Sequence, residues 1–143
     1  MILVNGADGI GTGWATTIPC YNPSEIIKNI EEKLKDKNFK FVRMNPWYKN
    51  FLGEISYNEA GSFTVKGVWK KIDKYTIEIT ELPVKKWIRD YKNFLEELMM
   101  SGLIIDEMKE FHKDNTVHFV LKLKEEVSVV DKSEGGIEKK LKL

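Results

Sequence analysis

The sequence has little of several features that would define its class. Cys20 is the one cysteine, which excludes an internal disulfide and favours a reducing compartment. No apolar run approaches the ~20 residues that span a bilayer, and the opening "MILV" is too short for a signal peptide. With 143 residues, of which 42% are hydrophobic and 31% charged, the chain fits one globular domain. We therefore expect an intracellular protein with no membrane partner.

An excess of basic residues is also missing. The formal net charge is +1, whereas a free-standing nucleic-acid module usually carries a strong positive charge. Three stretches are nevertheless locally basic, and they contain Lys35, Lys37, Lys40, Arg43 and Lys49; Lys66, Lys70, Lys71 and Lys74; and Lys85, Lys86, Arg89 and Lys92. Each stretch can be a solvated face of the protein or a contact with phosphate.

Motifs for catalysis and metal binding are absent from the sequence. It contains no Gly-x-Ser-x-Gly, no His-Glu-x-x-His and no Asp-x-Asp pattern. His112 and His118 could join Asp114 as metal ligands, but their spacing fits no known site. Cys20 could act as a nucleophile with a distant histidine, although a lone cysteine after proline is more often packed. We predict no catalytic residue and no metal site in this chain.

What the sequence does contain is a glycine-rich stretch, "NGADGIGTGWA", with four glycines between Gly6 and Gly13. A phosphate-binding Walker loop needs a lysine after the last glycine, and none follows Gly13. A dinucleotide fingerprint needs a helix directly after the glycines, which Pro19 and Pro23 prevent. A small nucleotide-dependent enzyme is therefore supported by the glycine count alone.

The first part of the chain is expected to contain one strand and one helix. The run "ILV", which ends at Asn5-Gly6, predicts a buried strand that enters a turn, and the stretch from 16 to 23 is expected to be irregular. Asn22, Pro23 and Glu25 form the start signal of an amphipathic surface helix. Its apolar residues recur on one face at helical spacing: Ile26, Ile27, Ile30 and Leu34.

The remainder predicts strands around a second helix. "FLGEISY" and "SFTVKGVW" flank a turn at 58–61, and "KYTIEIT" alternates as a strand with one buried face. A helix over 84–102 carries an apolar stripe of Trp87, Tyr91, Leu95 and Leu98, and a further hairpin turns at 113–115. We expect an α+β fold, in which two main amphipathic helices pack on a mixed, largely antiparallel sheet.

Several stretches together resemble a known family. "MILVNGADGIGTGW", "YNPSEIIKNI", "PWYKNFLGEI", "TIEITELPVKKW" and "FHKDNTVHFVLKL" occur in the order found in eukaryotic-type DNA topoisomerase II, a type IIA topoisomerase. The resembling segment lies just downstream of the active-site tyrosine and covers nearly the entire chain. Asp8 stands where the family more often has glutamate, and the tail from 125 to 143 matches more loosely.

The resemblance implies an ATP-dependent enzyme that passes one DNA duplex through a transient break in another. Residues 1–143 would form a single tower-like domain of the DNA gate, with residues 1–21 as a Gly-rich DNA-wedge loop and its entry strand. Ile10 would enter the minor groove and separate two base pairs. The alternative for Ile10 is a buried core residue whose neighbouring glycines only turn the chain.

Physical chemistry independently suits Ile10 to that role. A wedge must be apolar and stiff, as a β-branched side chain is, and Gly9 and Gly11 bring no side chain that would collide with the groove. The polar Asn5 and Thr12 are candidate phosphate or groove contacts. We expect Trp14 to anchor the loop to the core.

The resemblance also places the catalytic groups outside this segment. None of the five tyrosines follows an arginine, so the nucleophile is expected upstream of Met1. Mg²⁺ and ATP are implied for the full enzyme, and this segment is expected to bind neither and to be inactive alone. The implied partner is double-stranded DNA, in a nuclear homodimer, although an isolated fragment could be monomeric. The alternative function is a non-catalytic protein-interaction module that uses the aromatic loop 45–51, with Trp47 and Tyr48.

Overall fold

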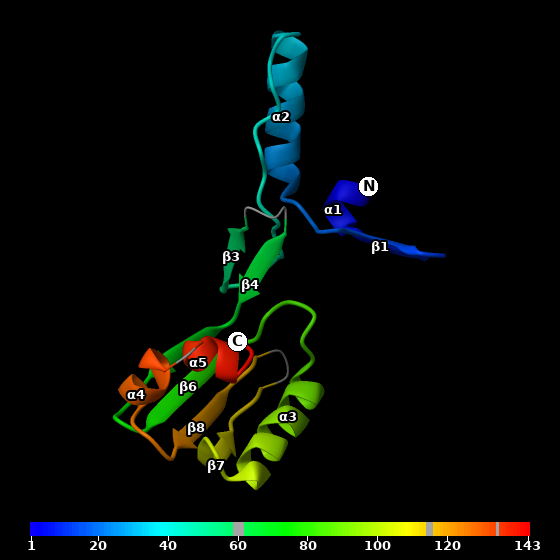
Figure 1. The fold of residues 1–143 in the computed structure, drawn as a ribbon. Helices are drawn as coiled ribbons and strands as arrows, with labels where there is room; N and C mark the ends of the chain where they lie inside the picture. The colour runs from blue at the N-terminus through cyan, green and yellow to red at the C-terminus, as the bar shows by residue number, and fades with distance from the viewer. Residues whose placement is uncertain (59–61, 114–115, 134) are drawn as a thin grey trace. The chain divides into compact units, whose positions relative to one another are not determined.

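The computed structural model describes residues 1–58, 62–113, 116–133 and 135–143. Contacts divide the chain into two compact units, which we consider separately. The first unit comprises Met1–Phe51 and Ile55–Thr64, and the second comprises Leu52–Glu54 and Val65–Leu143. Figure 1 shows the elements in chain order, from blue to red.

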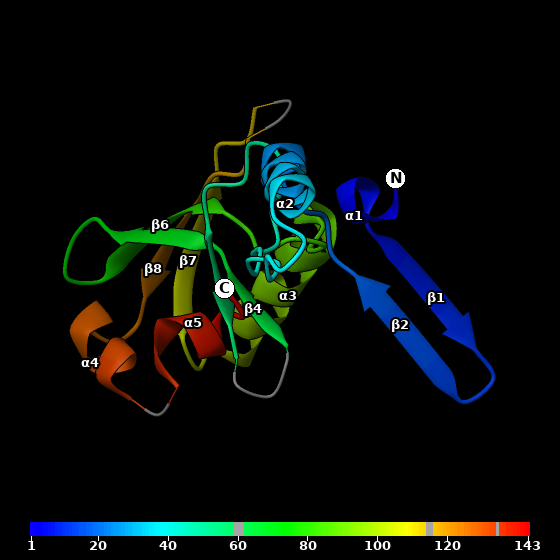
Figure 2. The same ribbon diagram turned by 90° about the horizontal axis from the view of Figure 1, so that it is seen from above.

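The first unit begins with a short helix and a β-hairpin. Helix α1 spans Ile2–Asn5, and the antiparallel strands β1 (Ala7–Gly11) and β2 (Trp14–Ile18) follow it (Figure 2). The predicted strand over "ILV" is therefore wrong: the amides of Val4 and Asn5 bond to the carbonyl of Met1, which closes a helical turn. Residues 16–18 were expected to be irregular, and this too is wrong, because pairing with β1 makes them a strand.

Helix α2 spans Pro23–Lys35 and starts where the sequence predicts. The Asn22 side chain accepts a hydrogen bond of 2.9 Å from the Ser24 amide, and Pro23 occupies the first turn. The helix does not bury the expected apolar face, because only Ile26 of its four predicted residues is buried. A polar residue, Asn29, is buried instead.

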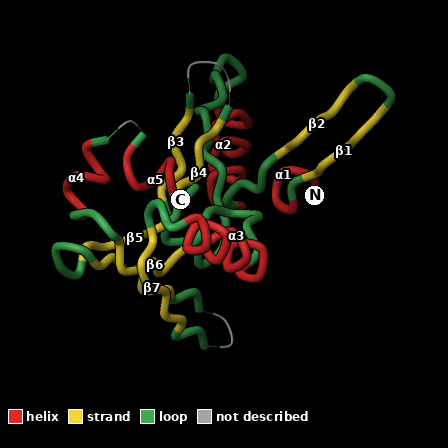
Figure 3. Tube along the Cα trace, turned by 60° about the horizontal axis from the view of Figure 1, so that its bottom comes forward, coloured by secondary structure: helices red, strands yellow, loops and turns green. Residues whose placement is uncertain are grey.

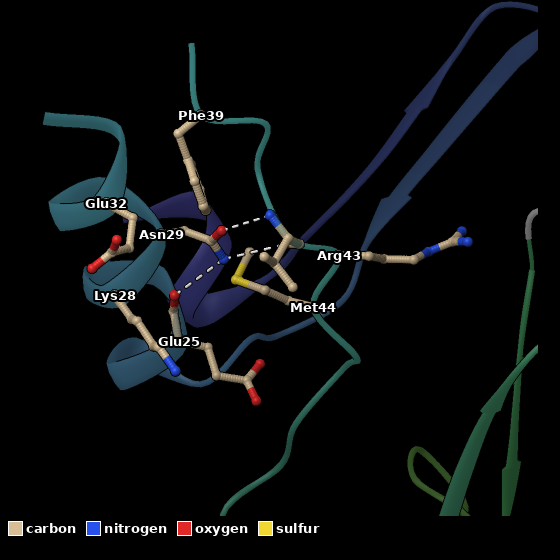
Figure 4. A pocket seen from close by; sticks show the side chains of 8 residues that line it. Glu25, Lys28, Asn29, Glu32, Phe39, Arg43 and Met44 are labelled. Carbon is tan, nitrogen blue, oxygen red and sulfur yellow. Dashed lines mark hydrogen bonds between the residues drawn. The ribbon is translucent and has the colours of Figure 1, made fainter. Parts of the chain in front are cut away.

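The amide of Asn29 ties α2 to the chain segment that returns beside it. Asn29 donates to the Val42 carbonyl at 3.1 Å and accepts from the Val42 amide at 2.8 Å, as one strand does with another (Figure 4). It also donates to the carbonyl of Glu25. Every polar atom of this buried side chain thus has a partner, which makes its burial tolerable.

Strands β3 (Glu54–Tyr57) and β4 (Phe63–Lys66) form a two-stranded sheet, as the sequence predicts. Their predicted turn at Asn58-Glu59-Ala60-Gly61 lies largely outside the described residues. The run after it was expected to be one strand, but it divides at Gly67 into β4 and β5 (Val68–Lys71). A Cβ atom at Gly67 would lie 2.3 Å from the carbonyl oxygen of Glu81, so only glycine permits this close approach.

The second unit is built on a four-stranded antiparallel sheet in the order β5-β6-β8-β7. Figure 3 draws the strands in yellow. Strand β6 spans Thr76–Glu81, β7 spans Ile105–Glu110 and β8 spans Phe119–Leu123. Their alternation is as predicted, with Ile77, Ile79, Phe119 and Leu121 fully buried on one face. The hairpin that joins β7 to β8 is confirmed, and Asp114 and Asn115 of its turn lie outside the described residues.

Helix α3 spans Ile88–Ser101 and packs Tyr91 and Leu95 into this core. It begins four residues later than predicted, because Lys85 adopts a left-handed conformation with φ 69°. Trp87 therefore precedes the helix and is exposed, so its predicted place on the apolar stripe is wrong. The predicted end of the helix at Gly102 is confirmed, since that residue is left-handed with φ 68°.

The tail contributes more to the core than its sequence suggests. Helices α4 (Val127–Lys132) and α5 (Gly136–Lys140) join α3 on the buried face of the sheet, through Val127, Val130 and Ile137. The expected α+β fold, with a largely antiparallel sheet and helices packed on it, is confirmed. Among the described residues, no helix has the length and apolar character needed to cross a bilayer.

Candidate nucleic-acid interface

The β1–β2 hairpin presents Ile10 to solvent. Ile10 pairs with Ala15, Gly11 pairs with Trp14, and the intervening Thr12-Gly13 makes a two-residue turn in which Gly13 has φ 83°. The side chain of Ile10 is 94% exposed, so the alternative of a buried core residue is wrong. An isoleucine that stays almost wholly exposed in its own chain contributes little to folding through its apolar surface.

The two glycines beside Ile10 have no internal reason to be glycine. A Cβ atom at Gly9 would meet nothing within 4 Å, and one at Gly11 would reach only the Trp14 carbonyl oxygen at 3.8 Å. Neither residue has a positive φ, in contrast to Gly13. Since the described chain could accommodate alanine at both positions, its own contacts do not account for the two glycines.

Trp14 does not anchor the hairpin to the core of this chain. Its side chain is 84% exposed, so that prediction is wrong. Paired residues of an antiparallel ladder project to the same face and successive residues alternate, which places Trp14 on the face opposite Ile10. The cross-strand neighbour of Trp14 on β1 is Gly11, which has no side chain to pack against the indole ring.

The structure brings four of the five predicted interface residues together. Gly9, Ile10, Gly11 and Thr12 are consecutive and exposed at the tip of the hairpin, whereas Asn5 lies at its base, at the end of α1. The five residues of β1 extend roughly 16 Å, so Asn5 and Thr12 cannot contact the same phosphate.

The basic stretches are partly neutralised by acids that lie far away in sequence. Lys66 Nζ is 2.9 Å from Glu138 Oε2, and Lys92 Nζ is 2.8 Å from Glu110 Oε1. The hydrogen bond and charge of each carboxylate raise the pKa of its lysine. Lysines that cluster in the sequence thus form ion pairs with glutamates that are distant in the sequence and close only in the fold.

A cavity of about 370 Å³ lies between α2 and the returning segment 39–44 (Figure 4). Its rim carries both signs of charge, from Glu25, Lys28 and Glu32. Arg43 is engaged elsewhere, with its guanidinium 3.1 Å from the ring centroid of Tyr57. Because its central polar residue, Asn29, is fully hydrogen-bonded within the chain, the cavity presents no obvious catalytic group.

Each histidine makes a structural contact through one ring nitrogen. His112 Nδ1 accepts from the amide of His118 at 3.0 Å, and His118 Nε2 lies 2.7 Å from Glu78 Oε1. Asp114, the third residue of the imagined metal site, lies outside the described residues. Cys20 is half-buried and faces Gly6, since a Cβ on Gly6 would lie 3.2 Å from its Sγ.

The aromatic loop 45–51 is fixed at a corner of the first unit. Pro46 is buried and bridges to Tyr21, and the Trp47 amide donates to the Cys20 carbonyl at 2.8 Å. Trp47 itself remains 40% exposed. These contacts tie Pro46 and Trp47 to the segment at Cys20 and Tyr21, and the use of the loop by a protein partner stays a prediction.

Comparison with known proteins identifies the family. The family of the A-type subunit of DNA gyrase/topoisomerase IV matches residues 1–143. This chain belongs to that family. DNA topoisomerase 2 top-2 of Caenorhabditis elegans is 49% identical in an alignment of 128 residues that covers 86% of this chain. DNA topoisomerase 2 of Arabidopsis thaliana is 42% identical and the alignment covers 96% of this chain. The predicted resemblance to eukaryotic-type topoisomerase II is thus confirmed.

A solved structure of a topoisomerase II domain has the same fold. The DNA-binding, cleavage and re-ligation domain of Plasmodium falciparum topoisomerase II matches with a TM-score of 0.87 and 41% identity, covering 99% of this chain and 19% of that one. The present chain spans only 8% of the C. elegans protein and 10% of the Arabidopsis protein.

Proposed function

We propose that this chain is the DNA-gate segment of an ATP-dependent type II DNA topoisomerase and that Ile10 is its minor-groove wedge. The observation that carries the proposal is the hairpin tip, where a 94% exposed isoleucine stands between two glycines that the chain itself does not require. The named relatives are DNA topoisomerases, and one solved relative is a DNA-binding and cleavage domain. Double-stranded DNA is the corresponding partner.

The energetics of the wedge are reasonable. Unstacking a base step costs a few kcal/mol and bending a short site costs roughly 1 to 6 kcal/mol more. Complete burial of one isoleucine side chain returns about 1.5 to 3 kcal/mol. The balance must come from contacts with phosphate, for which Thr12 and Asn5 are our candidates in this unit. Local placement of such contacts matters more than the net charge of +1.

Catalysis in this proposal belongs to other parts of the enzyme. The nucleophilic tyrosine would lie outside this chain, and Mg²⁺ and ATP would be bound elsewhere in a nuclear homodimer. That residues 1–143 form one tower-like domain also stays a prediction. The chain alone should therefore fail to relax supercoiled plasmid, and relaxation by the purified chain would contradict this assignment.

The decisive test measures DNA bending. We would place this chain in C. elegans topoisomerase 2 in exchange for its counterpart and follow energy transfer across an end-labelled duplex of about 30 base pairs. Ile10→Ala should sharply reduce bending while salt-dependent binding persists. Ile27→Ala is the matched control, because it removes the same atoms from another exposed isoleucine of the first unit. Equal bending of the duplex by the Ile10→Ala protein and by the control protein would contradict the proposal that Ile10 is a minor-groove wedge.

A further inference from the structure

The second unit contains a basic pocket that no step above has used. A cavity of about 220 Å³ is lined by lysines 85, 86 and 142 together with Trp87, Asp90 and the aromatic rings of α3. Asp90 is the single carboxylate among these lining residues. The pocket is thus concave, aromatic on one side and positively charged.

Tertiary contacts hold two of its lysines in place. The hydroxyl of Tyr91 donates to the Leu141 carbonyl at 2.8 Å in the buried core, which fastens the segment that carries Lys142 against α3. Lys86 Nζ donates to the carbonyl of Lys142 and lies 5.6 Å from the ring centroid of Tyr91. Lys142 Nζ lies 4.3 Å from the ring centroid of Phe94. Lys86 and Lys142 therefore line one pocket only when the tail has docked on α3.

Lys86 and Lys142 are the two lysines on which the chemistry of this pocket depends. Among the described residues, no carboxylate forms an ion pair with Lys86 or Lys142. Burial, and secondly the charge of Lys142, lower the pKa of Lys86, whereas ion-paired Lys66 and Lys92 have raised pKa values. The charge of Lys142 disfavours the charged form of Lys86, and a bound anion would relieve this.

We infer that this pocket binds a backbone phosphate of duplex DNA, through the ammonium groups of Lys86 and Lys142. A phosphate fits the chemistry because lysines bind it as point charges and the described part of the chain supplies these two with no counterion. Trp87, 75% exposed at the rim, offers a flat surface for the adjoining sugar. The inference rests on the proposed function, and it adds a phosphate contact in the second unit to the wedge of the first.

The test compares two charge-matched double variants of the chain. Lys86→Gln with Lys142→Gln removes the pocket charges, and Lys74→Gln with Lys132→Gln removes two exposed lysines that do not line it. Duplex binding is measured by fluorescence anisotropy over a range of salt concentrations. The pocket variant should weaken binding about tenfold and reduce the salt slope by about 1, and the control should change both far less. Lys142→Gln alone, whose side chain lies over the Phe94 ring, should show the same trend with the core left intact.

The outcomes separate this inference from the proposed function. Equal losses of duplex affinity in the pocket variant and the control would overturn the inference that the pocket binds phosphate. They would leave the proposed role of Ile10 unaffected. Failure of the unchanged chain to bind duplex would instead count against the proposed function. Inorganic phosphate, titrated against the indole NMR signal of Trp87, provides the third arm. Saturable binding there, without any loss of duplex binding in the pocket variant, would assign the pocket to a free phosphate and overturn the inference.

Discussion

The β1–β2 hairpin and the four-stranded sheet use the same antiparallel pairing and opposite distributions of side chains. In the hairpin, nine of the ten strand residues are exposed and Ile18 is intermediate. In the sheet, β6 and β8 alternate and bury Ile77, Ile79, Phe119 and Leu121 beneath three helices. The hairpin thus exposes its apolar side chains to solvent, whereas the sheet buries them in the core.

The difference shows what each apolar residue is for. A side chain buried at zero exposure contributes to folding by leaving water, whereas Ile10 can do so only when something else covers it. Stability and function should therefore separate between the two elements. Substitutions in the sheet should act on folding, and substitutions at the hairpin tip should act on DNA.

The largest expected effect is on the sheet. Phe119→Ala removes a fully buried ring that packs edge-on against Tyr91, with centroids 5.6 Å apart. It should lower the free energy of unfolding by about 3 to 5 kcal/mol, because it leaves a cavity. Ile10→Ala should change that free energy by less than about 0.5 kcal/mol, as is usual at an exposed site. Urea unfolding followed by circular dichroism measures both free energies. Similar losses of stability in the two variants would contradict the difference between the sheet and the hairpin.

Glycines should divide in the same way, with a smaller effect. Gly67→Ala forces a Cβ to within 2.3 Å of the Glu81 carbonyl oxygen and should cost about 1 to 3 kcal/mol through overpacking. Gly9→Ala and Gly11→Ala meet open space, so stability should be unchanged or rise by up to about 1 kcal/mol. The same two substitutions should reduce bending of the duplex. Unfolding midpoints and energy transfer would be measured on the same preparations. A lowered midpoint for Gly9→Ala or Gly11→Ala would show that the fold itself needs that glycine.

The smallest expected effect concerns acid. Asp73 Oδ1 accepts hydrogen bonds of 2.8 Å from the amides of Tyr75 and Thr76, and these bonds lower the pKa of Asp73 below its ordinary 3.8. A depressed pKa contributes stability that is fully present above the unfolded value and is lost as the pH falls through the folded one. Unfolding at pH 3 to 6 should show wild type losing its advantage over Asp73→Asn below about pH 4. Parallel curves for the two proteins would argue against this contribution.

Periodicity was sufficient where side chains alternate against a core. The strand around Ile77, the strand around Phe119 and the start of α2 at Asn22 all follow from local chemistry that tertiary contacts reinforce. Family membership was also accessible, because specific stretches such as "NGADGIGTGW" lie in the expected order.

Sequence could not show what depends on partners distant in the chain. The hairpin was missed because glycine is disfavoured in strands, and only cross-strand pairing makes Gly9 and Gly11 part of one. Trp14 and Trp87 were expected to be packed because tryptophan is apolar, yet both are largely exposed. The pairing of Lys86 with Lys142 depends on the docking of the tail and has no local sequence signal.

Residues 127–141 also bear on when the core of the second unit can form during synthesis. Val127 donates its amide to the Lys74 carbonyl, and Val130, Ile137 and Leu141 fill the core beneath β6, which lies about 50 to 65 residues earlier in the chain. Until residues 127–141 have left the ribosome, the apolar face of β6 lacks part of its cover. The exposed apolar face of β6 is thus prone to aggregation until translation of the second unit is finished.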